Sequence, residues 1–177
     1  MRSSLARFCR DQSGVFAVEF SILLPFMIVA LFGALEVTRE ARTAARLTSA
    51  AQTIADLVAQ QNNVVSSDLI DFCVGGKLVL APFSTSTFKV AVASVTYTSA
   101  ASGVVQDWQD LSCGSASSIS NVTTLAKNYV KNVKDSVIVA QVTYQYSPLV
   151  KTYLTSPFAM TKLGFARPRN GTSVTNN

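Results

Sequence analysis

Residues 15–35 read VFAVEFSILLPFMIVALFGAL, an apolar run with few polar interruptions. As an α-helix the run would be about 31 Å long, which matches a hydrocarbon core of roughly 30 Å. We therefore predict a transmembrane helix over 15–35. Pro25 lies in the middle of it and has no backbone N–H, so the carbonyl of Ser21 loses its partner. A kink or a locally unwound turn is predicted at Pro25.

A short basic segment precedes this run. Residues 1–14 carry Arg2, Arg7 and Arg10 against a single acid, Asp11. A plain single-pass anchor and a secretory signal peptide are two interpretations of such a start. A signal peptide would need a shorter apolar core of about 7–15 residues and a cleavage site with small residues. The core here is longer, which disfavours secretion.

Glu19 is an unusual residue for an apolar run. A carboxylate inside a membrane costs on the order of 2.5–3.5 kcal/mol on insertion scales, so it usually has a partner. If the chain is cut after Gly14, the α-amine of Val15 becomes the new N-terminus and Glu19 becomes the fifth residue. The carboxylate could then pair with an α-ammonium of the same or a neighbouring copy. The alternative is a charge that snorkels to the nearby membrane surface.

A basic leader, Gly14, four apolar residues, Glu19 and the aromatic Phe20 make the pattern of type IV-like prepilins. Residues 7–46 closely resemble the N-terminus of TadE-like proteins, the minor pilin-like (pseudopilin) components of the Tad/Flp tight-adherence pilus system. The segment FARPR at 165–169 is similar to an ending seen in that family.

This resemblance implies that a dedicated prepilin peptidase removes the leader after Gly14 and leaves Val15 as the new N-terminus. Glu19 would then be the fifth-position carboxylate, followed by Phe20 where Flp pilins often have tyrosine. The implied partners are the prepilin peptidase, other pilins and pseudopilins, an inner-membrane pilus assembly platform and membrane lipid. The implied location is the bacterial inner membrane, single-pass, with the N-terminus cytoplasmic and the head periplasmic. Incorporation into the fibre, a place at its tip and a priming role stay open.

The cysteine positions agree with that topology. Cys9 lies in the leader, so its removal turns an odd count into the pair Cys73 and Cys113. In an oxidising periplasm this pair would form a disulfide that closes a loop of about forty residues, contributing roughly 3–4 kcal/mol in the chain-entropy model. Two buried free thiols are the alternative.

The helix is predicted to continue past the membrane. Residues 36–61 contain no Gly or Pro, and apolar residues recur there at spacings of three or four. Such a stripe is typical of a helix that packs on its own domain. The residues of the stripe are Val37, Ala41, Ala44, Leu47, Ala51, Ile54 and Val58.

The rest of the chain predicts an α+β head over 62–166 and a flexible polar tail over 167–177. Four segments have the composition of strands, and together they predict a small antiparallel sheet: Lys89–Thr98, Val104–Leu111, Val137–Tyr146 and Pro157–Phe165. The fold class is therefore α+β, a long N-terminal helix followed by a small antiparallel-sheet head, pilin-like in outline.

The minor elements of the head are predicted from local signals. Asn121–Val133 has apolar residues at helical spacing and predicts a helix. Leu69–Cys73 predicts a short helical turn that Gly75-Gly76 breaks, and Leu78–Ala81 a short strand. A further helical turn is predicted over Pro148–Leu154.

Composition restricts the function. The chain has no histidine, which removes the commonest general base and most zinc and haem sites, so we expect no enzyme, no metal and no cofactor. Its net charge of +5 is spread along the chain, and we expect no nucleic-acid partner. The sequence predicts a minor pilin-like protein that acts by subunit packing. A single-pass membrane-anchored periplasmic binding domain unrelated to pili is the alternative, and a tethered Ser/Lys or carboxylate enzyme a third.

Overall fold

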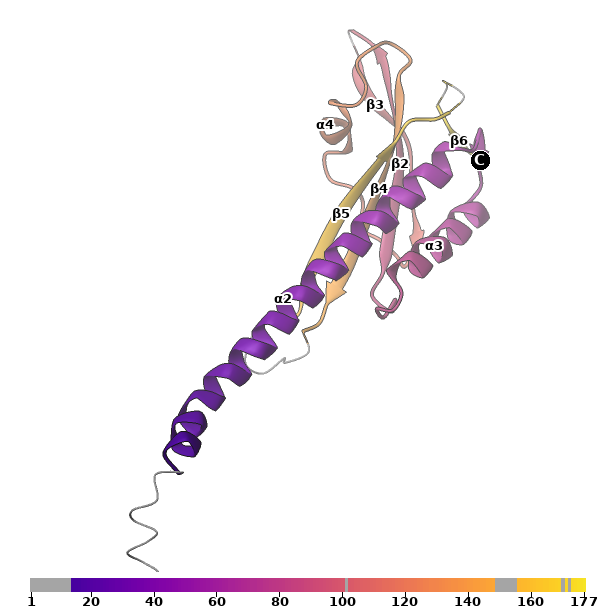
Figure 1. Cartoon of the computed structure of the whole chain (residues 1–177). Coiled ribbons are helices and arrows are strands. Elements are labelled where there is room, and N and C mark those ends of the chain that lie inside the picture. The colour runs from indigo at the N-terminus through magenta and orange to yellow at the C-terminus, as the bar shows by residue number, and fades with distance from the viewer. Residues whose placement is uncertain (1–13, 101, 149–155, 170, 172) are drawn as a thin grey trace, which may run out of the picture.

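The computed structural model describes residues 14–100, 102–148, 156–169, 171 and 173–177. A single helix, α2 (Val15–Ala59), leaves the head as a long rod (Figure 1). Its 45 residues confirm the predicted long N-terminal helix, which ends two residues before the predicted boundary. The helix continues across Pro25, and the kink expected there stays a prediction.

The head is built on a four-stranded antiparallel sheet in the order β3-β2-β4-β5. This confirms the predicted fold class, a long apolar helix followed by a small antiparallel sheet. All four predicted strands are present, each within two residues of its expected ends. They are β2 (Lys89–Ser99), β3 (Gly103–Cys113), β4 (Ser136–Tyr146) and β5 (Phe158–Ala166).

The second half of α2 packs on one face of this sheet. Leu47 and Ile54 are among its fully buried residues. The contact with β5 is close because Gly164 has no side chain, and a Cβ at Gly164 would lie 2.3 Å from the carbonyl oxygen of Ala51. Beside it, Gln52 donates to the carbonyl of Phe165 at 3.0 Å and accepts its N–H at 3.4 Å. The helix therefore satisfies part of the open backbone edge of β5.

A second helix, α3 (Ser66–Leu80), lies against α2 and corrects the sequence prediction. The expected break at Gly75-Gly76 and the expected strand over Leu78–Ala81 are both wrong, because the helix runs through the glycines. Gly76 is buried, and a Cβ on it would lie 2.4 Å from Cδ1 of Ile54 in α2. The glycine thus permits two helices to approach closely, and that packing outweighs its helix-propensity cost of about 1 kcal/mol.

The opposite face of the sheet is covered by the segment between β3 and β4. Only α4 (Val122–Ala126) is helical there, so the longer helix predicted over Asn121–Val133 is wrong beyond its first turns. The chain turns away because the Asp135 carboxylate accepts the backbone N–H groups of Lys131 and Asn132, both at 3.0 Å. These local bonds compete with helix continuation.

The C-terminal segment closes the head. The composition of 167–177 predicts a flexible tail, but the structure pairs β6 (Thr175–Asn176) in parallel with β1 (Asn63–Val64). Val174 is buried, and its carbonyl accepts the indole N–H of Trp108 at 2.6 Å. The end of the chain therefore packs next to the end of α2. The helical turn predicted over Pro148–Leu154 lies almost wholly outside the described residues.

Candidate membrane and assembly surface

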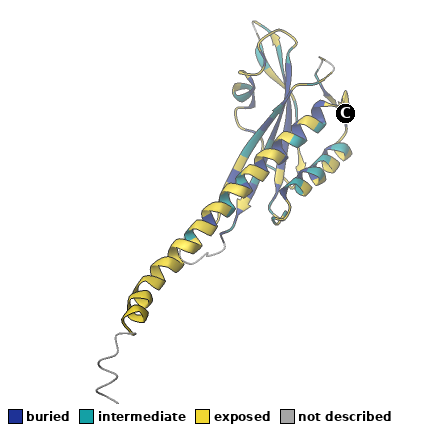
Figure 2. Ribbon diagram, viewed as in Figure 1, coloured by how far each residue is buried: buried dark blue, intermediate teal, exposed yellow. Residues whose placement is uncertain are grey.

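In the part of the chain that the structure describes, no head residue covers the first half of α2. Every residue from Gly14 to Leu35 is exposed except Gly33, which is half-buried, and Figure 2 shows this half as an uncovered rod. The most apolar window of the helix has none of its residues buried, and the helix is long and apolar enough to cross a membrane. An uncovered apolar surface of this size is a site for lipid or for other apolar helices.

The predicted processing point lies at the start of this rod. Gly14 is the residue directly before α2, and Val15 is its first residue, with 52% of its surface exposed. Among the described residues other than its chain neighbours, none has an atom within 4 Å of a Cβ built on Gly14. The Gly14–Val15 junction is therefore open to a partner. The leader itself, residues 1–13, lies outside the described residues, and its cleavage stays a prediction.

Glu19 and Phe20 are both exposed on the same uncovered rod, within two turns of Val15. The described part of the head packs only further along the helix, so it cannot supply a partner for the Glu19 carboxylate (Figure 1). A carboxylate in lipid is stabilised by an ionic partner, and the described part of the head does not supply one.

A buried acid marks the place where α2 reaches the head, and the sequence analysis missed it. Glu36 is only 7% exposed, and the hydroxyl of Tyr146 donates to its carboxylate at 2.5 Å. Burial first, and the Glu36 acceptor second, raise the pKa of Tyr146 above its usual value. The available signal was an acid immediately after the apolar run, but its tyrosine partner lies 110 positions away.

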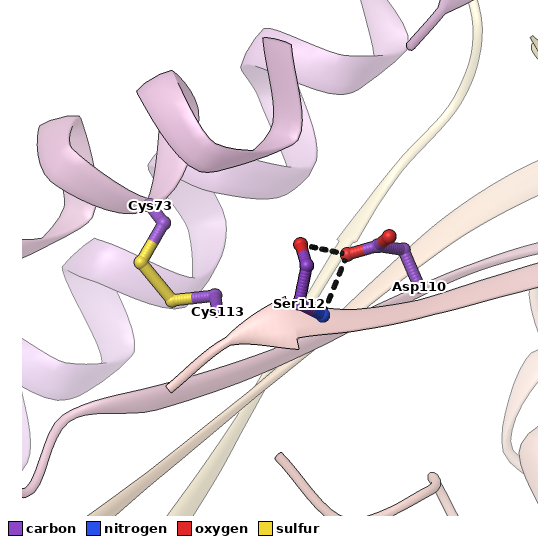
Figure 3. The surroundings of a disulfide bond; sticks show 4 residues. All are labelled: Cys73, Asp110, Ser112 and Cys113. Atoms are coloured by element: carbon purple, nitrogen blue, oxygen red, sulfur yellow. Dashed lines mark hydrogen bonds between the residues drawn. A yellow bond between two sulfur atoms is a disulfide. The ribbon is translucent and has the colours of Figure 1, made fainter. Parts of the chain in front are cut away.

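A disulfide joins α3 to the sheet. Cys73 of α3 and Cys113 at the end of β3 are bonded, with their Cα atoms 5.9 Å apart, which agrees with the pairing expected from the cysteine count (Figure 3). Both residues are buried. Next to the bond, Asp110 accepts the N–H and the hydroxyl of Ser112 at 3.0 and 2.6 Å, which closes the end of β3. The bond thus ties α3, and through it α2, to the β3 edge.

The head offers no evident centre for metal chemistry. Within the residues that the structure describes, no three His, Cys, Asp or Glu side chains gather to hold a metal ion. The surface that the fold presents most clearly is the apolar rod of α2, held by a disulfide-linked head. An uncovered apolar helix on a folded head is consistent, by length and composition, with the class of single-pass membrane proteins.

Comparison with known families points to one such class. Residues 14–56 match the family model described as TadE-like protein, which confirms the resemblance seen in the sequence. The TadE-like family comprises proteins associated with the Tad pilus. The match begins at Gly14 and ends within α2, so it covers the uncovered rod and most of the packed half but none of the sheet. No curated protein and no solved structure matches the chain significantly.

Proposed function

We propose that the protein is a minor pilin-like (pseudopilin) subunit for assembly of a Tad/Flp type IVb pilus. It acts by packing against other subunits in the inner membrane and periplasm. One observation carries this proposal: a single helix has an uncovered apolar half, continuous with a half that is buried on its own head. Such a helix keeps the head attached while its free half passes between lipid and other helices.

Transfer of the free half of α2 from lipid to contact with other apolar helices involves little change in hydrophobic free energy. Lipid tails are as apolar as Leu or Phe side chains, so association there depends on packing and on polar contacts rather than on a hydrophobic gain. Glu19 is the charged residue in this half, and a carboxylate in lipid is stabilised by an ammonium partner. Pairing with the α-amine of a neighbouring subunit would set the register between helices.

The proposal includes the processing and the topology. The prepilin peptidase removes residues 1–14, the N-terminus faces the cytoplasm, and the head lies in the periplasm. The Cys73–Cys113 bond supports this orientation, because disulfides persist in oxidising compartments. Other pilins, pseudopilins and the inner-membrane assembly platform are the proposed partners. The alternative is an anchored binding domain unrelated to pili, whose head lies beyond the matched residues 14–56.

The test is the intact mass of the protein extracted from membranes, with and without a co-expressed prepilin peptidase. We expect loss of residues 1–14 only when the peptidase is present. Gly14→Val should block the cleavage, whereas Gly33→Val should not, although neither position is crowded. A full-length mass in both cases would sink the pilin assignment and leave the anchored binding domain. Cleavage near Ala34 in both cases would instead identify a secreted protein.

A further inference from the structure

A stripe of arginines follows the uncovered half of α2. Arg39, Arg42 and Arg46 are spaced by three and four, so they lie along one side of the helix. Arg42 and Arg46 are exposed, whereas Arg39 is half-buried. Further along this side, Leu57 lies 3.8 Å from the position of a Cβ on Gly75 in α3. The arginines therefore extend, toward the apolar rod, the side of α2 on which α3 packs.

Two of these arginines line a groove. Arg42, Ala45, Arg46 and Ser49 of α2 form one wall, and Pro82 with Phe83 from the loop after α3 form the other, enclosing about 490 Å³. That loop lies at the end of α3 that points back toward the uncovered rod (Figure 1). In the described part of the chain, no carboxylate pairs with Arg42 or Arg46. The groove therefore presents two uncompensated cations and a hydroxyl beside an aromatic ring.

The position of the groove along the helix selects its occupant. At 1.5 Å per residue, Arg39 lies about 6 Å, Arg42 about 10 Å and Arg46 about 16 Å beyond Leu35. The headgroup layer is about 5–8 Å deep on each side of the hydrocarbon core. Side chains on a helix lean toward its N-terminus, which here is the membrane side, and long arginines follow that direction. A helix tilt of about 20° brings Arg46 only about 1 Å nearer to the membrane, so the approach to the headgroups depends on the length and direction of the arginine side chains.

We infer that Arg42 and Arg46 form a binding site for the phosphate groups of anionic phospholipids, in the leaflet on the side of the head. This inference rests on the membrane insertion of α2 in the proposed function, but not on cleavage of the leader or on pilus assembly. Guanidinium groups bind phosphate through two parallel hydrogen bonds, which suits a lipid headgroup that enters the groove from the membrane side. Bound lipid would hold the base of the head on the membrane surface and fix its rotation about the helix axis.

The chain offers a matched control for charge. Lys127 and Lys131 are exposed and follow α4, at the end of the head remote from the uncovered rod (Figure 1). Removing them lowers the net charge by the same amount as removing Arg42 and Arg46. Because electrostatic attraction falls off within a Debye length of about 8–10 Å, the lysines cannot reach the same leaflet.

The experiment measures which lipids the full-length chain retains. The chain is purified into micelles that contain equal amounts of phosphatidylglycerol and phosphatidylcholine with the same acyl chains, and bound lipids are counted by native mass spectrometry. We expect preferential retention of phosphatidylglycerol. Arg42→Gln with Arg46→Gln should lower that preference by about twenty-five-fold, since each surface arginine contributes about fivefold. Lys127→Gln with Lys131→Gln should leave it unchanged.

Four other outcomes would contradict the inference, and a fifth would contradict only the proposed function. Equal retention of both lipids by the unmodified chain, or equal losses in the arginine and lysine variants, would overturn the site. Displacement of phosphatidylglycerol by millimolar inorganic phosphate would identify a free-anion site instead. Binding of an acidic protein at these arginines with no lipid preference would make the groove a protein interface. Retention of no lipid at all would remove the membrane anchor as well, whereas lipid preference without peptidase cleavage would reject only the pilin assignment.

Discussion

The two halves of α2 differ in an unexpected direction. The half that the head covers contains small residues that are fully buried, Ala50, Ala51 and Ala55, and Ala51 lies directly against Gly164 of β5. The half that nothing covers contains large ones, such as Phe16, at 78% exposed, and Phe26, at 69%. In the covered half, Ala51 lies where the backbone of β5 comes near, while the larger Leu47 and Ile54 fill the core. The covered half packs specifically against its own head, whereas the uncovered half offers a general apolar surface to lipid or to other helices.

The largest expected difference between the halves comes from one substitution made in each. Ile54→Ala should lower the free energy of unfolding of the head by about 2–5 kcal/mol, because Ile54 is fully buried between α2, α3 and the sheet. Ile28→Ala, in the uncovered half, should change it by less than about 0.5 kcal/mol. Denaturant unfolding in detergent, followed by the fluorescence of the single tryptophan, Trp108, measures both. Similar losses from the two variants would show that the halves are not independent.

The disulfide should account for a slightly smaller effect. Replacing Cys73 and Cys113 together by Ser should destabilise the head by about 3–4 kcal/mol, since the cross-link closes a loop of 40 residues. Cys9→Ser serves as the control and should leave the unfolding transition unchanged. The readout is the same transition, recorded with and without a reductant. If reduction leaves the unmodified head as stable as before, then helix packing alone holds α3 on the sheet.

The close contact between the covered half of α2 and strand β5 is tested at Gly164. Gly164→Ala would place a methyl group against the backbone of Ala51, so α2 and β5 must separate slightly, at a cost of about 1–3 kcal/mol. Gly33→Ala adds the same methyl group where nothing lies within 4 Å and should be neutral for the head. Hydrogen exchange of the β5 amides should rise only in the first variant. Equal protection in both would contradict the close contact.

The smallest expected effect lies at the junction of the two halves. Tyr146→Phe should cost about 1–2 kcal/mol, because Glu36 stays buried without its hydroxyl donor. The pKa of Tyr146 is raised in the folded head. The protonated Tyr146 hydroxyl therefore contributes its full share to the stability of the head below the usual tyrosine pKa of 10.0. It is lost as the pH rises above that value, because the unfolded chain then releases the proton first. Unfolding curves between neutral pH and pH 11 should show this loss, and Tyr146→Phe should flatten it. If Tyr146→Phe loses stability with rising pH in the same way as the unmodified chain, the proposed role of the Tyr146 hydroxyl is wrong.

Much of the fold could be predicted from the sequence. The long helix was predictable because 21 apolar residues followed by a stripe spaced by three and four admit few other structures. The four strands were predictable because runs such as Val137–Tyr146 combine branched and aromatic residues. Local composition was sufficient wherever the packing agreed with it.

The errors occurred where a distant partner changed the meaning of a residue. Gly75-Gly76 has the composition of a helix break, but Ile54 of another helix makes the glycine useful inside α3. Asn121–Val133 has helical spacing, but the carboxylate of Asp135 turns the chain back. The tail has a polar composition, yet Trp108 and Val64 hold it on the head. A single sequence contains no signal for these pairings.

The candidate surface divides in the same way. The sequence by itself determined the apolar length of residues 15–35, the isolated carboxylate of Glu19 and the cysteine pair, because helix period, membrane thickness and residue chemistry act locally. Only the tertiary structure decided where the free half of α2 ends, which acid is buried with Tyr146, and that Arg42 and Arg46 face Phe83 across a groove. Those features depend on backbones brought together from positions far apart in the chain, and their closeness is set by packing rather than by sequence pattern.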